Sequence, residues 1–330
     1  VKMGFFTTDG QLIRKWEIET RRRENCEHVI EDIAESIREN LKKDNLTLND
    51  CVGIGMGVPG PVLPKGYVEV CVNLGWKDMY PARELSDRLE GISVWVGNDA
   101  NIAALGEAWQ GGAKGFNDVV MLTLGTGVGG GIIINGEIVT GRHGLAGEIG
   151  HLYVRSDEKD CCNCGGHGCL EQVASATGIV KEAKRQLAES DMESSLRDCK
   201  KLTAKEVLDA AKAGDALAEQ VMDVVVKYLG IAISHIALTV DPDVFVIGGG
   251  VSKAGQYLID KIKVMYDFYT PISKNRGDIV LATLGNDAGI YGAAKCAYVN
   301  FFCRSSLKKF LSNSTHSSWI SPSSRRVSTW

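Results

Sequence analysis

The chain has 330 residues, of which 44% are hydrophobic and 24% charged, the composition of a globular protein long enough for two domains of ordinary size. It has no run of 18 or more apolar residues and no signal-peptide layout at its first residues, so we expect no membrane-spanning segment and a cytoplasmic location. The net charge is −4, and because residues 299–330 carry five basic and no acidic side chains, the rest carries 32 basic against 41 acidic residues. That acidic body would repel a nucleic-acid backbone, so we expect no nucleic-acid partner.

The first third of the chain alternates strand-like and helix-like patterns. Apolar runs predict strands, and apolar residues at every fourth position predict helices. In order, the expected elements are strands at residues 3–6 and 12–18, a helix at about 25–43, strands at 52–58 and 94–96, and a helix at 98–110. Asp9-Gly10 marks a hairpin turn. The glycine-rich segment Gly111 to Gly115 marks a hinge or domain boundary.

The remainder continues the alternation. The expected elements are strands at residues 119–124 and 131–134, helices near 178–189, 203–213 and 215–238, a strand at 244–247, a helix to about 269, a strand at 279–282 and a helix at 287–299. This alternation indicates α/β architecture. We expect a small α/β domain of residues 1–113 plus 287–298 and a large α/β domain of residues 114–286. Residues 299–330, ten of which are serine, are expected to be a disordered or non-native tail without function.

Three stretches have the chemistry of phosphoryl transfer, which needs a base near the accepting hydroxyl and donors that neutralise phosphate charge. Asp99 begins a helix after a short strand and is the candidate base, although a helix cap is the simpler reading. Its neighbour Asn98 is either a turn former or a ligand of sugar hydroxyls. Residues Gly125 to Gly131 offer backbone N–H groups to phosphate oxygens, with the Thr126 hydroxyl as a further donor, or form only a tight turn. Gly248-Gly249-Gly250, between a strand and a helix, is a weaker nucleotide signal.

Four of the ten cysteines fall within residues 161–169, a density that favours a metal site over a disulfide scaffold. The expected ligands of a closed tetrahedral zinc site are His151, Cys162, Cys164 and Cys169. A closed site has no open position for water, so we expect the zinc to be structural. His143 and His167 are rival nitrogen ligands, and Cys161 is expected to be a spectator.

Two glutamates, Glu148 and Glu171, lie beside the expected metal ligands. A single glutamate is more often a solvated surface charge. Here zinc would hold their loop around a polyhydroxylated ligand, and the second ring nitrogen of His151 can bond a hydroxyl. We therefore expect both glutamates to bind a sugar.

Taken together, these residues resemble the ROK family of sugar kinases and sugar-responsive repressors over about residues 1–298, and most of all its glucose-phosphorylating members. The most specific motifs are Gly147-Glu148-Ile149-Gly150-His151 and the Cys-x-Cys-Gly-x-x-Gly-Cys pattern at residues 162–169. Further agreement comes from Gly57-Val58-Pro59-Gly60-Pro61, Asn73-Leu74-x-Trp76 and Asp287-Ala288-Gly289-x-x-Gly292-Ala293-Ala294.

The resemblance implies an actin/hexokinase-like (ribonuclease H-like) fold of two α/β domains with a structural zinc site. It implies ATP-dependent phosphorylation of a hexose, most of all glucose, at the 6-hydroxyl, with Mg²⁺, Asp99 as the base and a homodimeric protein. The implied hexose-binding residues are Gly60, Asn98, Asp99, Glu148, His151 and Glu171. The implied ATP-binding residues are Gly125, Thr126, Gly127, Gly248, Gly249 and Gly250.

One departure from the family concerns ATP. Family members have a strand and an Asp-x-Gly-Gly-Thr loop just before the position of Val1, and that loop handles ATP phosphates and Mg²⁺. We therefore expect this chain to resemble an N-terminally incomplete kinase with exposed strand edges, an unrelated C-terminal tail and poor activity.

Three alternatives remain open. The first is a related kinase for fructose, mannose or an N-acetylhexosamine, because hexose specificity depends on a few hydrogen bonds that motifs do not reveal. The second is a sugar-responsive transcriptional repressor, against which Asp99 argues, since a sensor needs no base. The third, a zinc-dependent nucleic-acid module, is disfavoured by the acidic body.

Overall fold

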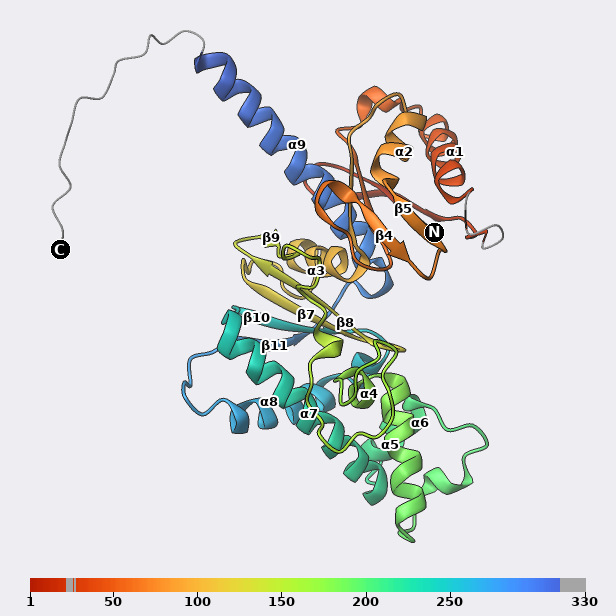
Figure 1. Ribbon diagram of the computed structural model, residues 1–330, viewed down its shortest axis with the longest axis vertical. Helices are drawn as coiled ribbons and strands as arrows, with labels where there is room; N and C mark the ends of the chain where they lie inside the picture. Colours follow the sequence, from red (N-terminus) through yellow and green to blue (C-terminus); the bar gives the residue numbers. More distant parts are fainter. Residues whose placement is uncertain (22–25, 27, 315–330) are drawn as a thin grey trace, which may run out of the picture.

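The computed structural model describes residues 1–21, 26 and 28–314 (Figure 1). One part of the molecule holds strands β1 to β6 with helices α1 and α2, and the other holds a five-stranded sheet with its covering helices. Helices α3 and α9 lie where the two parts meet (Figure 1). This arrangement places the candidate residues of both parts near one junction.

The five-stranded sheet is the core of the larger part. Its strands are β7 (Val119–Leu124), β8 (Val128–Ile134), β9 (Glu137–Ile138), β10 (Val244–Gly248) and β11 (Asp278–Leu281). Their order is β11-β10-β7-β8-β9, with β10 parallel to both of its neighbours and β8 antiparallel to both of its neighbours. Helix-containing crossovers join the parallel strands, as expected for α/β architecture.

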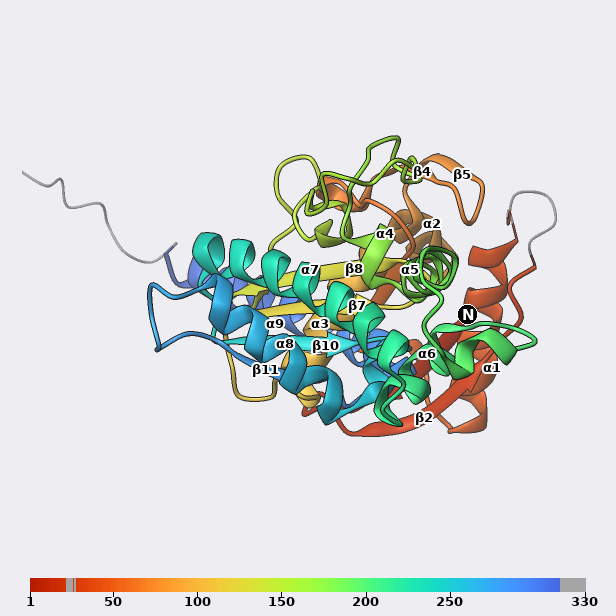
Figure 2. The same cartoon turned by 90° about the horizontal axis from the view of Figure 1, so that it is seen from below.

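Alternation along β7 gives the sheet two apolar faces. Val120, Leu122 and Leu124 belong to a core shared with α5, α6, α7 and α8. Val119 and Met121 point to the opposite face, where α3 packs. Figure 2 shows α7 and α8 on one side of this sheet and α3 and α9 on the other. Because successive strand side chains point to opposite faces, a strand buried on both faces is apolar throughout.

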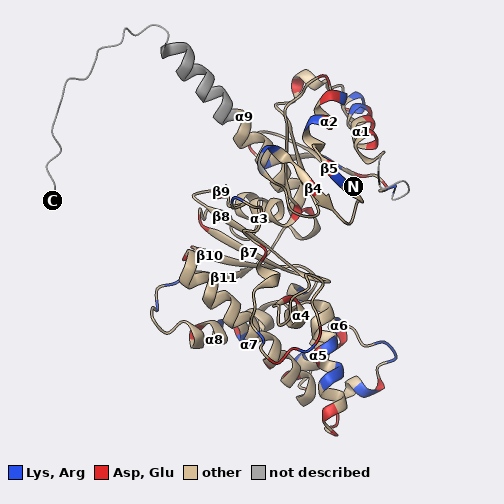
Figure 3. Ribbon diagram, in the orientation of Figure 1, with Lys and Arg blue, Asp and Glu red and all other residues tan. Residues whose placement is uncertain are grey.

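The nine α-helices of the described residues have these bounds: α1 Val29–Lys43, α2 Pro81–Arg88, α3 Asp99–Gln110, α4 Glu171–Ala174, α5 Ala176–Glu189, α6 Ala204–Lys212, α7 Ala216–Val240, α8 Gln256–Tyr269 and α9 Ala288–Ser314. Helix α7 is long and apolar enough to cross a membrane, but about half of its residues are buried in the core beneath the sheet. Basic and acidic side chains are interspersed along α1, α5 and α6, as is usual for solvent-facing helix surfaces (Figure 3).

The smaller part contains three separate strand pairs rather than one ladder. They are β1 (Lys2–Phe6) with β2 (Leu12–Glu17), β3 (Ile54–Val58) with β6 (Val94–Asn98), and β4 (Val68–Cys71) with β5 (Trp76–Met79). Among the described residues, β1 and β3 each have one strand neighbour. A cavity of about 750 Å³ is lined by both of these strands and extends to Asp99.

Helices α3 and α9 pack with their backbones in close approach. A Cβ on Gly292 would lie 1.7 Å from the carbonyl oxygen of Ile102, so only glycine fits there. The chain passes between the two parts twice, from α3 to β7 and from β11 to α9. Both connections therefore run beside this helix pair.

Most predicted elements are confirmed to within a few residues, and several differences have local causes. The predicted strand at 131–134 begins earlier, at Val128, so Gly129 and Gly130 pair with β7 instead of lying in the loop. Glycine is required along this strand because the Gly147 carbonyl lies too close for a side chain at Gly130, and Ala104 of α3 too close for one at Gly131. The 3₁₀ turn η6 (Val251–Ala254) separates β10 from α8, where one helix was expected. Strands β4 and β5 and helix α2 were not predicted.

Helix α9 continues through residues 299–314, where the sequence suggested a disordered or non-native tail. That this segment is non-native and without function stays a prediction. This stretch contains neither proline nor glycine, so its composition does not stop the helix. Residues 315–330, and the expected start of the first helix at Asn25, lie outside the described residues. The domain boundaries proposed from the sequence stay a prediction.

Candidate functional site

The first turn of α3 is held by its own cap. Asn98 ends β6 and is the N-cap, and its side-chain oxygen accepts hydrogen bonds from the N–H groups of Ala100 (3.0 Å) and Asn101 (3.1 Å). The Asn98 amide nitrogen donates to the carbonyl oxygen of Gly60 at 3.0 Å. Asn98 therefore joins the turn at Gly60 to the start of α3, and both of these predicted sugar-contacting residues lie together.

Asp99 is the first residue of α3 and lines the cavity. The residue is exposed, yet desolvation by the neighbouring protein raises the pKa of Asp99, although the hydrogen bond from the Ala100 N–H at 2.9 Å opposes the shift. Asn98, rather than Asp99, supplies the helix cap. Asp99 is therefore not needed as the N-cap of α3. Its carboxylate remains available to act as a base.

The predicted phosphate loop is a tight connection between β7 and β8. The Gly125 N–H donates to the Gly127 carbonyl at 2.9 Å, and the Thr177 hydroxyl donates to the Thr126 carbonyl at 3.0 Å. The loop is therefore anchored from the start of α5. The exposed Thr126 hydroxyl remains free of these anchoring bonds, as a phosphate donor must.

Glu171, the first residue of α4, contacts this loop directly. Its carboxylate accepts the Val128 N–H at 3.0 Å, and a Cβ on Gly127 would lie 2.0 Å from the same oxygen. Its other oxygen lies 3.7 Å from the sulfur of Cys162. Glu171 thus bridges the predicted phosphate loop and the cysteine cluster, a contact that the sequence did not reveal.

The second glycine segment lies beside the first. Gly248 ends β10 opposite Thr123 of β7, and Gly249 has a φ of +85°, with a Cβ there 2.5 Å from the carbonyl oxygen of Leu124. A side chain at Gly249 would overlap that backbone, and a positive φ favours glycine. Two segments more than 100 residues apart in sequence therefore form one surface at the ends of adjacent parallel strands.

Glu148 and His151 lie at the two ends of one short turn. Glu148 precedes the 3₁₀ turn η4 (Ile149–His151), and the His151 N–H donates to the Glu148 carbonyl at 3.1 Å. Both side chains are exposed. The preceding residue, Gly147, has a φ of +92° and lies against the side-chain oxygen of Asn101, so this turn packs on the first turn of α3. The Glu148 segment and the Asp99 segment are therefore neighbours.

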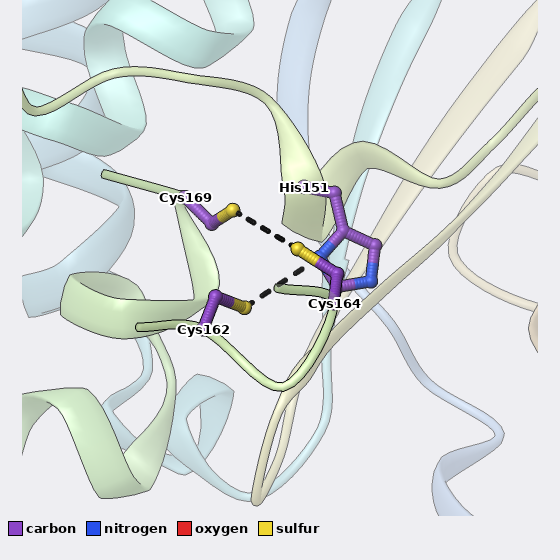
Figure 4. A group of neighbouring side chains, drawn as sticks. All are labelled: His151, Cys162, Cys164 and Cys169. Carbon is purple, nitrogen blue, oxygen red and sulfur yellow. Dashed lines mark hydrogen bonds between the residues drawn. The ribbon is translucent and has the colours of Figure 1, made fainter. Parts of the chain in front are cut away.

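The predicted metal ligands come together (Figure 4). One ligand atom from each of four residues lies within 4.8 Å of all the others: His151, Cys162, Cys164 and Cys169. The sulfurs of Cys164 and Cys169 are 3.7 Å apart, and the sulfur of Cys162 is 3.8 Å from Nδ1 of His151. A tetrahedral zinc with Zn–S bonds of about 2.3 Å separates two sulfurs by about 3.8 Å, so this donor set and spacing fit zinc.

The rival ligands lie outside this group. His167 pairs instead with Cys161, whose sulfur is 3.5 Å from its Nε2, while its Nδ1 faces the Asp160 carbonyl at 3.1 Å. His143 is likewise not part of the four-residue group. The geometry agrees with the expectation that Cys161 is a spectator.

A buried ion pair supports the cysteine loop. Arg155 donates to Glu182 of α5 at 2.8 Å, and their side chains are 4% and 2% exposed. The backbone N–H groups of Val154 and Arg155 both donate to the Gly168 carbonyl, at 2.8 and 3.1 Å, one residue before Cys169. This pair fastens the loop that bears the cysteines to the large part of the molecule.

The chain is similar to known proteins in both sequence and structure. The ROK family profile matches residues 1–299. A glucokinase from Halalkalibacterium halodurans is 43% identical over 297 residues, which cover 88% of this chain and 90% of that protein.

Two similar solved structures represent a kinase and a transcriptional regulator. A ROK family glucokinase from Streptomyces griseus, in complex with glucose and AMPPNP, has a TM-score of 0.70 at 30% identity and covers 88% of this chain and 94% of its own. A ROK family transcriptional regulator, a homologue of the E. coli MLC protein, has a TM-score of 0.78 at 25% identity and covers 93% of this chain and 78% of its own. The α/β fold of the ROK sugar kinases, expected from the sequence, is confirmed. The chain belongs to the ROK family.

Proposed function

We propose that this protein is a glucokinase, which transfers the γ-phosphoryl group of ATP to the 6-hydroxyl of glucose. The observation that carries this is the position of Asp99 relative to the phosphate loop. Strand β8 follows the loop directly, and a Cβ on Gly129, the second residue of β8, would lie 3.4 Å from the Cβ of Ala100, the residue after Asp99. A base on the first turn of α3 is thus held next to a loop suited to phosphate.

In this proposal Asp99 accepts the proton of the 6-hydroxyl as the oxygen attacks phosphorus. Its raised pKa brings the carboxylate closer to the range in which a general base is effective. The remaining sugar hydroxyls are assigned to the other hexose residues proposed from the sequence: Gly60, Asn98, Glu148, His151 and Glu171. Glu171 also touches the phosphate loop, so sugar and phosphate binding share one side chain.

ATP is assigned to the two glycine segments, 125–127 and 248–250, with Mg²⁺ arriving as part of the nucleotide complex. Their backbone N–H groups lie at the ends of β7 and β10, where parallel sheets commonly bind nucleotides. Zinc is assigned a structural role at the three cysteines and His151, because that donor set leaves no open coordination position. A bound zinc would fix the turn that carries Glu148 and the helix that begins at Glu171.

The relatives support this assignment at the level of the reaction. The H. halodurans relative is a glucokinase, and the S. griseus structure contains glucose and an ATP analogue. The proposal extends to a cytoplasmic location and a homodimer. The nine cysteines whose side chains the structure describes are free thiols, as is usual in a reducing compartment. Light scattering would determine the oligomeric state.

The test is ATP-dependent phosphorylation of a panel of glucose, fructose, mannose and N-acetylglucosamine. We expect the highest kcat/KM with glucose and a loss of about 10²- to 10⁴-fold in Asp99→Asn. Asp209→Asn, on the exposed side of α6, is the matched control and should behave as wild type. A version that carries an Asp-x-Gly-Gly-Thr strand and loop ahead of Val1 is assayed in parallel.

A sugar-responsive regulator is the second candidate, favoured by the structural likeness to the ROK transcriptional regulator. Calorimetry with glucose distinguishes the two functions. Glucose binding without turnover on any sugar, in both versions of the chain, would overturn the kinase assignment in favour of a sensor. If the enzyme prefers fructose, mannose or N-acetylglucosamine, that sugar replaces glucose as the assigned substrate, and the proposed mechanism is unchanged.

A further inference from the structure

Glu107 lies in the last turn of α3 and is completely buried, with 0% of its surface exposed. It sits where the chain passes between the two parts of the molecule. One connection runs from α3 through residues 111–118 to β7, and the other runs from β11 through residues 282–287 to α9.

The carboxylate of Glu107 binds backbone N–H groups from both connections. One oxygen accepts from Gly112 at 2.8 Å and from Thr283 at 3.0 Å, and the other accepts from Leu284 at 2.9 Å. Gly112 and Leu284 are 172 positions apart in the sequence, yet they share one side chain. Within the part of the chain that the structure describes, Glu107 therefore links the two connections, residues 111–118 and 282–287, by hydrogen bonds to both of its carboxylate oxygens.

Helix stability does not explain an acid at this position. The C-terminal end of a helix carries partial negative charge, so a carboxylate in the last turn is unfavourable by itself. Full burial of a carboxylate is also costly unless hydrogen bonds replace its lost water. The three N–H donors supply that replacement, which indicates that the site is built around the two connections rather than around α3 alone.

We propose that Glu107 is a positioning residue: it holds the two connections between the parts of the molecule together as one hinge, and it thereby fixes the position of Asp99. Both residues belong to α3, eight positions apart, or about 12 Å along the helix axis. A rigid helix transmits the orientation fixed at one end to the residue at the other. Loosening the hinge therefore shifts Asp99 relative to the phosphate loop on the five-stranded sheet.

The experiment compares Glu107→Gln and Glu107→Ala with Glu189→Gln, which changes an exposed glutamate at the end of α5. Hydrogen–deuterium exchange is followed by mass spectrometry in peptides covering residues 108–116 and 280–288. We expect exchange to rise in both peptides together, more in Glu107→Ala than in Glu107→Gln, which keeps one acceptor oxygen. In the Glu107 variants, peptides from β7 and β10 should exchange as in wild type. In the Glu189→Gln control, all peptides should exchange as in wild type.

Activity gives the second readout, and this part rests on the proposed kinase function. We expect kcat to fall about tenfold or more in Glu107→Gln while KM for glucose changes less than about threefold, because misplacing a catalytic group affects the chemical step most. The exchange readout does not need turnover, so a failure of the kinase assignment and a failure of the hinge assignment are distinguishable.

Leu284→Pro tests the same hinge without altering Glu107. Proline removes one donor, and the φ of −79° at Leu284 is compatible with its ring. The double variant with Glu107→Gln should be no worse than the more severe single variant, because both remove the same interaction. Faster exchange in only one of the two peptides, a uniform rise across the molecule, or strictly additive effects would overturn the proposal.

Discussion

Replacing Glu182 with leucine should destabilise the protein more than replacing its partner Arg155 with methionine. The two side chains form a pair that is almost fully buried, with a nitrogen–oxygen distance of 2.8 Å. Without Glu182, the charged partner that the Arg155 guanidinium keeps among the described residues is Asp157, which is 63% exposed. Without Arg155, Glu182 still accepts from Arg185 at 2.7 Å and from Gln186 at 2.9 Å.

The size of the effect follows from this asymmetry. Breaking a buried ion pair by removing one partner costs about 3–5 kcal/mol, because the other charge stays buried without compensation. We place Glu182→Leu near the upper end of that range and Arg155→Met near the lower end. The double variant leaves neither charge behind and should be more stable than Glu182→Leu alone.

Thermal and urea unfolding measure the difference, with Lys205→Ala as control because its pair with Asp209 is largely exposed. We expect the melting temperature to fall by roughly 10 °C in Glu182→Leu and by no more than about 2 °C in the control. Equal melting temperatures in Glu182→Leu and the control would refute the reasoning that the pair supports the fold.

The pH dependence provides an independent check. Burial alone would raise the pKa of Glu182, but hydrogen bonds from Arg155, Gln186 and Arg185 outweigh it and hold the pKa below its usual value. A depressed carboxyl pKa stabilises the folded protein above the unfolded pKa of about 4.3, and this contribution is lost as the pH falls through the folded pKa. The stability gap between wild type and Glu182→Leu should therefore narrow below about pH 4.

Three further predictions concern the site. Because its surroundings raise the pKa of Asp99, kcat/KM should decrease as the pH is lowered, with a midpoint above the ordinary Asp pKa of about 3.9. A midpoint at or below that value would contradict the assignment of Asp99 as the base. Metal analysis should find about one zinc per chain, lost in Cys162→Ser and kept in Cys161→Ser; equal zinc content in both would exclude the proposed ligand set. Gly127→Ala would drive a methyl group into Glu171, so KM should rise for ATP and glucose together, by roughly tenfold or more, and a change for ATP alone would contradict a shared residue.

Local features of the fold could be predicted because their causes are local. The predicted turn at Asp9-Gly10 joins the antiparallel strands β1 and β2, and Gly10 has a φ of +94°, which glycine adopts at low cost. The apolar period of residues 29–41 similarly predicted a helix close to its observed position, whereas the cap of α3 is Asn98 and not the neighbouring Asp99 that the sequence suggested. The hairpin of β4 and β5 escaped prediction because its strands are only four residues long and half exposed, which leaves little periodicity to detect.

The sequence alone determined the composition of the site: a carboxylate after a short strand, two glycine segments, and a His/Cys set with zinc spacing. These signals are visible in the sequence because the chemistry requires particular residue types at short separations along the chain. Only the tertiary structure decided what each carboxylate contacts. Glu171 reaches the predicted phosphate loop 43 residues away, and Glu107 reaches Thr283 across 176 residues. Such contacts depend on how the sheet, α3 and α9 pack, and packing between distant segments leaves no periodic trace in a single chain.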